Sequence, residues 1–124
     1  MRHQIAGKKL GRPSGQRSAL RRSLITQFLE HERIHTTRAK AVAVRGEVEK
    51  LVTLAKHGIK AGDQKMVHAR RTVAARLGSA AAVKRLFDEI APRFEKTPGG
   101  YTRILRLGQR KGDAAEMVLL EFVE

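Results

Sequence analysis

The sequence predicts an α+β fold: a two-layer domain with the element order α-β-α-α-α-β-β, a small sheet and a basic N-terminal arm. Two observations carry this prediction. Apolar residues between positions 15 and 94 recur every three or four residues, as on the buried face of amphipathic helices. After the Pro-Gly-Gly breaker at 98–100 the pattern becomes extended, as in strands. The 124 residues fit a single domain over 1–124, with the arm at 1–14 and a globular core at 15–124.

The first elements follow from local signals. Residues 1–14 contain glycine and proline and show no apolar period, so we expect an extended arm without a core of its own. Ser14 is a suitable N-cap for a helix over about 15–32, whose apolar stripe contains Leu20, Leu24, Ile25 and Phe28. The β-prone segment 33–37 is short and predicts a strand.

A second helix is predicted over about 38–57, with Thr37 as its cap and Gly58 as its end. Its stripe has clean three-four spacing and consists of Ala41, Val44, Val48, Leu51, Val52 and Ala55. A loop at 58–62 should follow.

Asp63 is expected to cap a third helix over about 64–77, which Gly78 should stop. Ser79 can then cap a fourth helix that reaches about Phe94. Pro92 falls inside that span, so the helix should be kinked in its last turn or end near residue 91.

Two extended segments, 101–107 and 116–123, enclose a loop with glycine and aspartate and predict an antiparallel hairpin. A lone hairpin is marginally stable in water. We therefore expect the strand at 33–37 to join the hairpin, with the helices packed on one face of the sheet.

Positive charge dominates the composition. The chain has 26 Lys+Arg against 12 Asp+Glu, which gives a formal net charge of +14. The excess is concentrated at the N-terminal side, where residues 1–41 hold ten bases and two acids and Glu30 is the first acid. A small domain with this much like charge repels itself, so a polyanionic partner is expected.

The composition also excludes several classes of protein. The absence of cysteine excludes a disulfide scaffold, a thiolate zinc site and a cysteine nucleophile. Aromatic residues make up only 4%, which argues against single-strand binding on stacking platforms. No apolar run approaches the roughly 20 residues that span a bilayer, and the basic N-terminus lacks the apolar region of a secretory signal. We therefore expect a cytoplasmic protein that does not bind membranes.

Enzymatic motifs are missing. His31 and His35 are four residues apart, but a predicted helix ends between them, so they should not share a face. The sequence has no HExxH motif and no phosphate-binding glycine loop, and the adjacent Asp88 and Glu89 would point in different directions on a helix. We expect no catalytic residue, metal site, cofactor or small-molecule substrate.

Basic residues gather at three places and suggest contacts to RNA phosphates. Arginine outnumbers lysine sixteen to ten, and its planar guanidinium suits phosphate and base recognition. The candidate RNA-binding residues are Arg2, His3, Lys8, Lys9 and Arg12 in the arm, Arg17, Arg21 and Arg22 early in the first helix, and Arg103, Arg106, Arg110 and Lys111 in the hairpin. We expect the helix arginines to hold phosphates jointly with the free N–H groups of its first turn.

Several motifs resemble those of the bacterial large-subunit ribosomal protein seventeen family. They are the Met-Arg-His start with its Gly-Lys-Lys-Leu arm, the segments 33–41 and 86–94, and Gly-Gly-Tyr-Thr-Arg-Ile-Leu-Arg at 99–106. The resemblance implies an α+β structural protein of the large subunit that binds 23S ribosomal RNA and neighbouring ribosomal proteins, without a catalytic site or cofactor. The basic motif after the predicted strand adds Arg38 and Lys40 to the candidate RNA contacts.

Two other classes of function remain open from the residues alone. A DNA-compacting nucleoid protein would use the hairpin as a basic β-arm, although the sequence shows no obvious dimer seam. An RNA-cleaving protein would use histidine for general acid–base chemistry, and would lose activity on His35→Ala.

Overall fold

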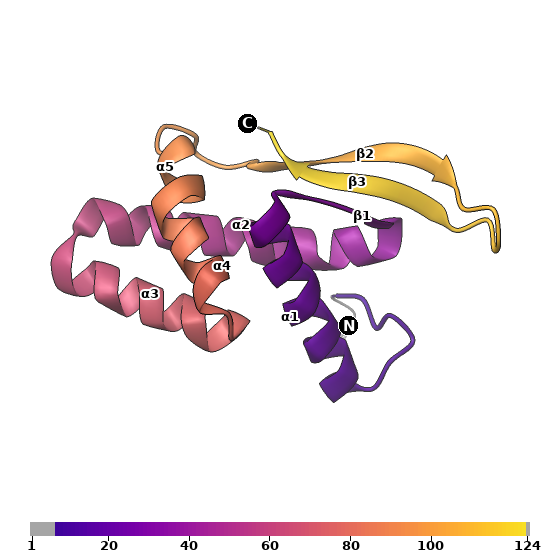
Figure 1. Ribbon diagram of the computed structural model, residues 1–124, viewed down its shortest axis with the longest axis horizontal. Coiled ribbons are helices and arrows are strands. Elements are labelled where there is room, and N and C mark those ends of the chain that lie inside the picture. Colours follow the sequence, from indigo (N-terminus) through magenta and orange to yellow (C-terminus); the bar gives the residue numbers. More distant parts are fainter. Residues whose placement is uncertain (1–6, 124) are drawn as a thin grey trace, which may run out of the picture.

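The computed structural model describes residues 7–123, and the candidate contacts Arg2 and His3 lie outside that range. The elements follow the chain as α1 (Ser14–His31), β1 (Arg33–Thr37), α2 (Arg38–Ala61), α3 (Asp63–Leu77), α4 (Ala80–Arg85), a π-helical turn (Leu86–Ile90), α5 (Ala91–Arg93), β2 (Thr102–Gln109) and β3 (Glu116–Phe122). The fold is α+β, as predicted, with a helical layer against one face of a small sheet (Figure 1).

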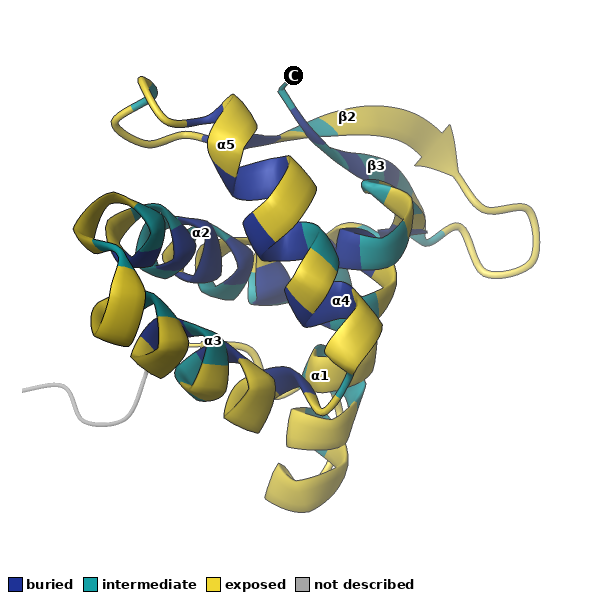
Figure 2. Cartoon of the chain, turned by 60° about the vertical axis from the view of Figure 1, so that its left-hand side comes forward, coloured by how far each residue is buried: buried dark blue, intermediate teal, exposed yellow. Residues whose placement is uncertain are grey.

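The sheet has three antiparallel strands in the order β1-β3-β2, so the strand at 33–37 joins the hairpin as expected. Alternate residues of β3 are buried, among them Val118 and Leu120, and they pack toward the helices. A bulge between Arg106 and Gly108 shifts the register of β2 near the end of the hairpin. The hairpin beyond this point extends past the helical layer and is exposed (Figure 2).

The core lies where α2 crosses under the sheet and contacts the other helices. Its α2 face is the predicted three-four stripe, all of it buried. An aromatic cluster joins the layers: the ring centroids of Phe28 and Phe122 are 4.5 Å apart, and Phe94 lies 5.6 Å from Phe122 and 5.2 Å from Tyr101. These contacts hold α1, the end of α5 and both hairpin strands in one unit.

The predicted end of the second helix at Gly58 is wrong, because α2 continues for three more residues to Ala61. Gly58 is a buried helical residue, and a Cβ built on it would lie only 2.6 Å from the Cβ of Ala69 on α3. It is therefore a point of close helix approach rather than a stop signal. Gly62 alone connects the two helices, in place of the predicted loop at 58–62.

Three of the four predicted caps do not form a side-chain bond. Ser14 is the first residue of α1 and Pro13 occupies the cap position, while Thr37 occupies the cap position of α2 but its hydroxyl accepts no hydrogen bond from the helix. Asp63 is the first residue of α3 rather than its cap. The Ser79 hydroxyl does accept from the amide of Ala82, as predicted.

The fourth helix changes its winding before Pro92 instead of ending there. In the π-helical turn the amide of Ala91 donates to the carbonyl of Leu86, five residues back. Pro92 has no N–H to donate, and its ring would press on the carbonyl one turn earlier in a regular helix. The wider turn directly precedes the proline, and helical structure continues to Arg93.

Candidate nucleic-acid interface

The described part of the arm, residues 7–13, carries three exposed cations and belongs to no helix or strand. Lys8 and Lys9 are exposed, and the Arg12 guanidinium donates to the carbonyl of Leu10 at 2.7 Å. Gly11 has a positive φ of 64° and helps the chain turn toward Pro13, the residue before α1. The arm thus presents its charges to solvent beside the start of the first helix.

The arginines of α1 differ in their surroundings. Since the helix begins at Ser14, Arg21 and Arg22 lie about 10 Å further along its axis, at about 1.5 Å per residue. Both lie beyond the first turn, and a phosphate shared between them and its N–H groups stays a prediction. Arg17 lies one turn in and is half-buried.

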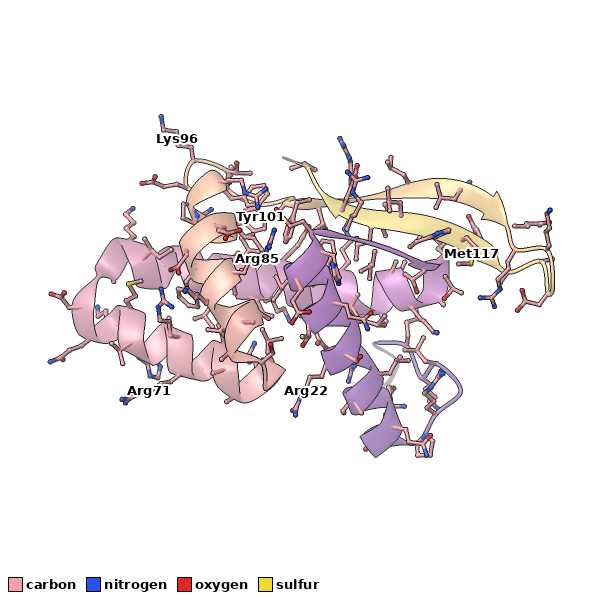
Figure 3. All side chains as sticks on the ribbon, viewed as in Figure 1. Arg22, Arg71, Arg85, Lys96, Tyr101 and Met117 are labelled. Atoms are coloured by element: carbon pink, nitrogen blue, oxygen red, sulfur yellow. The ribbon has the colours of Figure 1, made fainter. Side chains whose placement is uncertain are left out.

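Arg21 also has a partner within the protein. Its Nη1 lies 3.3 Å from a carboxylate oxygen of Glu47 on α2, and the pair links the two helices. Arg22 is exposed and points away from the body of the protein, as does Arg71 on α3 (Figure 3). Neighbouring positions in the sequence therefore supply one arginine to the fold and leave the other open to a partner.

The three candidate arginines of the hairpin all form ion pairs within it. Arg103 lies 2.7 Å from Glu121 and Arg106 lies 3.5 Å from Glu116, both across the strands. Arg110 binds Asp113 through two hydrogen bonds of 3.0 and 2.7 Å in the tip. These bonds lower the pKa of Asp113 to about 2 and raise the pKa of Arg110. The hairpin thus carries little uncompensated charge.

The start of α2 supplies two further candidates, since Arg38 is exposed and Lys40 is half-buried. Within residues 7–123 no ion pair engages the candidates that remain, namely Lys8, Lys9, Arg12, Arg17, Arg22, Arg38, Lys40 and Lys111. The arm, the start of α2 and the hairpin tip lie toward one end of the long axis, opposite the α2–α3 connection (Figure 1). The fold therefore gathers most of the predicted contacts that are far apart in sequence.

Other arginines serve the packing of the helices. Arg85 of α4 lies 2.7 Å from Glu32, which follows α1 with a left-handed φ of 65°, and Arg93 pairs with the same carboxylate. Burial raises the pKa of Glu32, but the hydrogen bonds from Arg93 and Arg85 outweigh burial and lower the pKa overall. This cluster fixes the end of α1 against α4 and α5.

Sequence reasoning missed two cations that the fold brings near Arg22. Lys50 of α2 and Arg76 of α3 are exposed and share a pocket with the α1 arginines. They are distant from the arm in the sequence, and only the packing of α1, α2 and α3 brings them together. Exposed positions beside an apolar stripe are typical of solvated helix faces, so no local signal singles these two residues out.

In the described part of the chain, no group of three or more histidine, aspartate or glutamate side chains is placed to hold a metal ion. Among these same residues, no helix combines the length and the hydropathy that crossing a bilayer requires.

Comparisons with known proteins show the family of this chain. A family model described as ribosomal protein L17 matches residues 20–123. The large ribosomal subunit protein bL17 of Thermoanaerobacter sp. (strain X514) is 50% identical over 116 residues, 94% of this chain and 97% of that protein. Its counterparts are 50% identical over 123 residues in Thermomicrobium roseum, covering 99% of each chain, and 46% identical over all 124 residues in Trichlorobacter lovleyi, covering 94% of that protein. The chain therefore belongs to the ribosomal protein L17 family, as the resemblance of its motifs predicted.

Proposed function

We propose that this protein is a non-catalytic structural constituent of the large ribosomal subunit in the cytoplasm, where it binds 23S ribosomal RNA and contacts neighbouring ribosomal proteins. The observation that carries the proposal is that eight of the candidate cations form no ion pair within the described residues, 7–123. The relatives, which are named as large-subunit proteins, match nearly the whole chain and support it.

In this proposal the cations neutralise phosphates and release the counterions that surround RNA. The arm makes the main contact with RNA in this proposal. Lys8, Lys9 and Arg12 are exposed and belong to no helix or strand, so packing does not restrict where their side chains can reach. Arg22 and Arg38 extend the contact onto the helices. Each hairpin arginine already faces a carboxylate that offsets part of its charge, so the hairpin contributes less affinity per arginine than the arm contributes per cation.

The test is a binding titration of the purified protein against 23S ribosomal RNA and against duplex DNA, between about 50 and 200 mM salt. With about 6–10 phosphate contacts, RNA affinity should fall by about 10³–10⁵ over this range. A slope of log affinity against log salt shallower than about −3 contradicts the proposal. Equal or tighter binding to duplex DNA favours the nucleoid alternative instead.

A matched pair of variants then tests the arm. Replacing Lys8, Lys9 and Arg12 by alanine should weaken RNA binding by about tenfold or more, or about 1.4 kcal/mol. The control replaces Lys60, Lys65 and Lys96, three exposed lysines that form no ion pair within residues 7–123, and removes the same charge. Lys60 and Lys65 flank the α2–α3 connection and Lys96 follows α5, so all three lie outside the candidate interface. Equal losses in the two variants contradict a specific role for the arm, because they reflect net charge alone.

A further inference from the structure

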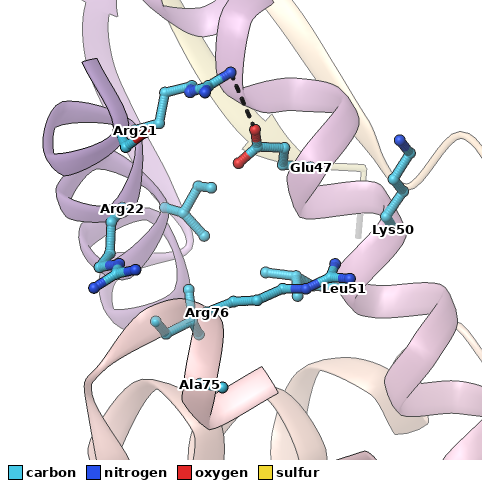
Figure 4. A pocket seen from close by; sticks show the side chains of 10 residues that line it. Arg21, Arg22, Glu47, Lys50, Leu51, Ala75 and Arg76 are labelled. Carbon is cyan, nitrogen blue, oxygen red and sulfur yellow. Dashed lines mark ion pairs between the residues drawn. The ribbon is translucent and has the colours of Figure 1, made fainter. Parts of the chain in front are cut away.

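A pocket of about 430 Å³ opens between α1, α2 and the C-terminal end of α3 (Figure 4). Four cations line it, two from α1 and one from each of the other helices: Arg21, Arg22, Lys50 and Arg76. Among the described residues that line it, Glu47 is the only acid, and it is already paired with Arg21. The pocket therefore carries a net positive charge that its own residues do not compensate.

The floor of this pocket is apolar. Ile25, Leu51 and Leu77 line it and are only 3%, 2% and 4% exposed. Little of this floor is left in water, and the apolar surface still open to a ligand includes the exposed methyl group of Ala75 at its edge. A bare phosphate gains nothing from such a surface, whereas the flat face of a nucleobase can cover it. The volume also lies within the range of about 300–1,000 Å³ that is typical of small-ligand sites.

The cations of the pocket can bind both the base and the phosphate of a nucleotide. Arg76 extends from the end of α3 across the pocket toward Leu51, and its planar guanidinium can stack on a base (Figure 4). Arg22 and Lys50 stand on the two sides of the opening with their charged ends turned outward (Figure 4), so they offer charge to a phosphate at the rim rather than inside the pocket. The backbone of α3 offers no amide to a phosphate here. The helix ends in carbonyl groups, and the amide of Gly78 already donates to the carbonyl of Ala74.

We propose that this pocket receives one unstacked nucleotide of the ribosomal RNA, with its base against the apolar floor and its phosphate between the cations. The inference rests on the proposed function and adds a specific contact to it. Glu47 gives the pocket an acceptor for the N–H groups on the edge of a base. An acidic side chain of a neighbouring protein would satisfy the cations but leave the apolar floor without a matching surface.

Two pairs of variants of the full chain test this proposal against 23S ribosomal RNA. Lys50→Ala with Arg76→Ala removes pocket charge, and its control, Lys60→Ala with Lys65→Ala, removes equal charge from α2 and α3 outside the pocket. Ala75→Trp fills the pocket without changing charge. Its control is Ala74→Trp, at an adjacent exposed position of α3 that does not line the pocket.

Both pocket variants should bind RNA about tenfold more weakly than the wild type, and both controls should stay close to it. The charge variant should also flatten the slope of log affinity against log salt by about 1 for each phosphate that it no longer neutralises. Chemical probing should show a base that is protected in the wild-type complex and reactive in the Ala75→Trp complex. Circular dichroism confirms folding, and Ala75→Leu replaces the tryptophan variant if the latter unfolds.

The outcomes separate this proposal from the proposed function. If the wild type binds RNA with a steep salt dependence but the pocket variants bind like their controls, the pocket proposal is overturned and the proposed function stands. The same holds if affinity falls but no base changes its reactivity, since the cations then contact only the backbone or a protein. If the wild type itself shows no preference for ribosomal RNA, both proposals fail.

Discussion

Two glycines of α2 should respond in opposite ways to alanine. Gly46 and Gly58 lie in the same helix, but nothing lies within 4 Å of a Cβ built on Gly46, which is exposed. A Cβ on Gly58 would meet the Cβ of Ala69 at 2.6 Å, with the backbone of Met66 and the ring of Phe87 at 3.7 Å. The second site thus has no free space, because both atoms of the closest contact are fixed to helix backbones.

The magnitudes follow from two opposing effects. Replacing a helical glycine by alanine stabilises a helix by about 1 kcal/mol, and this gain is shared by both sites. At Gly58 the added methyl group also overpacks the contact between α2 and α3, which costs about 1–3 kcal/mol. Gly46→Ala should therefore raise the free energy of unfolding by about 1 kcal/mol. Gly58→Ala should lower it by up to about 2 kcal/mol, the overpacking cost less the helix gain.

Urea denaturation followed by circular dichroism measures both changes, and the difference between the variants isolates the packing cost. Repeating Gly58→Ala in an Ala69→Gly background removes the atom it would strike. In that background the change should be as stabilising as Gly46→Ala. Equal effects of Gly46→Ala and Gly58→Ala in the otherwise wild-type protein would refute the close approach of the two helices.

Three further changes test individual contacts of the fold and the interface. Glu32→Gln should destabilise the protein by about 1–3 kcal/mol, because two arginines no longer share a carboxylate. Because the pKa of Glu32 is lowered in the folded protein, its contribution to stability is complete above pH 4.5, its ordinary pKa. This contribution is lost as the pH falls through the lower pKa of the folded state, which acid titration of the wild type and the variant would detect. Tyr101→Phe should cost about 1 kcal/mol in a urea titration, since the hydroxyl has partners on α2. Those partners, Lys56 and Thr53, lie 3.0 and 3.1 Å from it. Asp113→Asn should free Arg110 and tighten RNA binding if the hairpin tip contacts RNA, and unchanged affinity would place the tip outside the interface.

The sequence predicts the elements well where a local signal and tertiary packing agree. The strand at 33–37 and the end of α3 at Gly78 are both as predicted, since β-prone residues and a left-handed glycine serve the fold directly. The prediction for Gly58 is wrong because the role of this residue depends on Ala69, eleven residues further on in another helix. A glycine in an apolar stripe has the same local pattern whether it ends a helix or lets a second helix approach.

The same distinction governs the interface. A count of arginines gives the hairpin as much binding capacity as the first helix, but the register of β2 and β3 places Arg103 beside Glu121 and the bulge leaves Arg106 close to Glu116. Register is a tertiary property, so the composition reveals the excess of charge but not which charges are already paired. The N-terminal cations show the same limit, because no acid precedes Glu30 and neither the arm nor the start of α1 has a carboxylate nearby in the sequence. Arg21 nevertheless pairs with Glu47 of α2, whereas Lys8, Lys9 and Arg12 form no ion pair within residues 7–123. Only the fold therefore distinguishes the cations that stay open to a partner from those that find a carboxylate far away in the sequence.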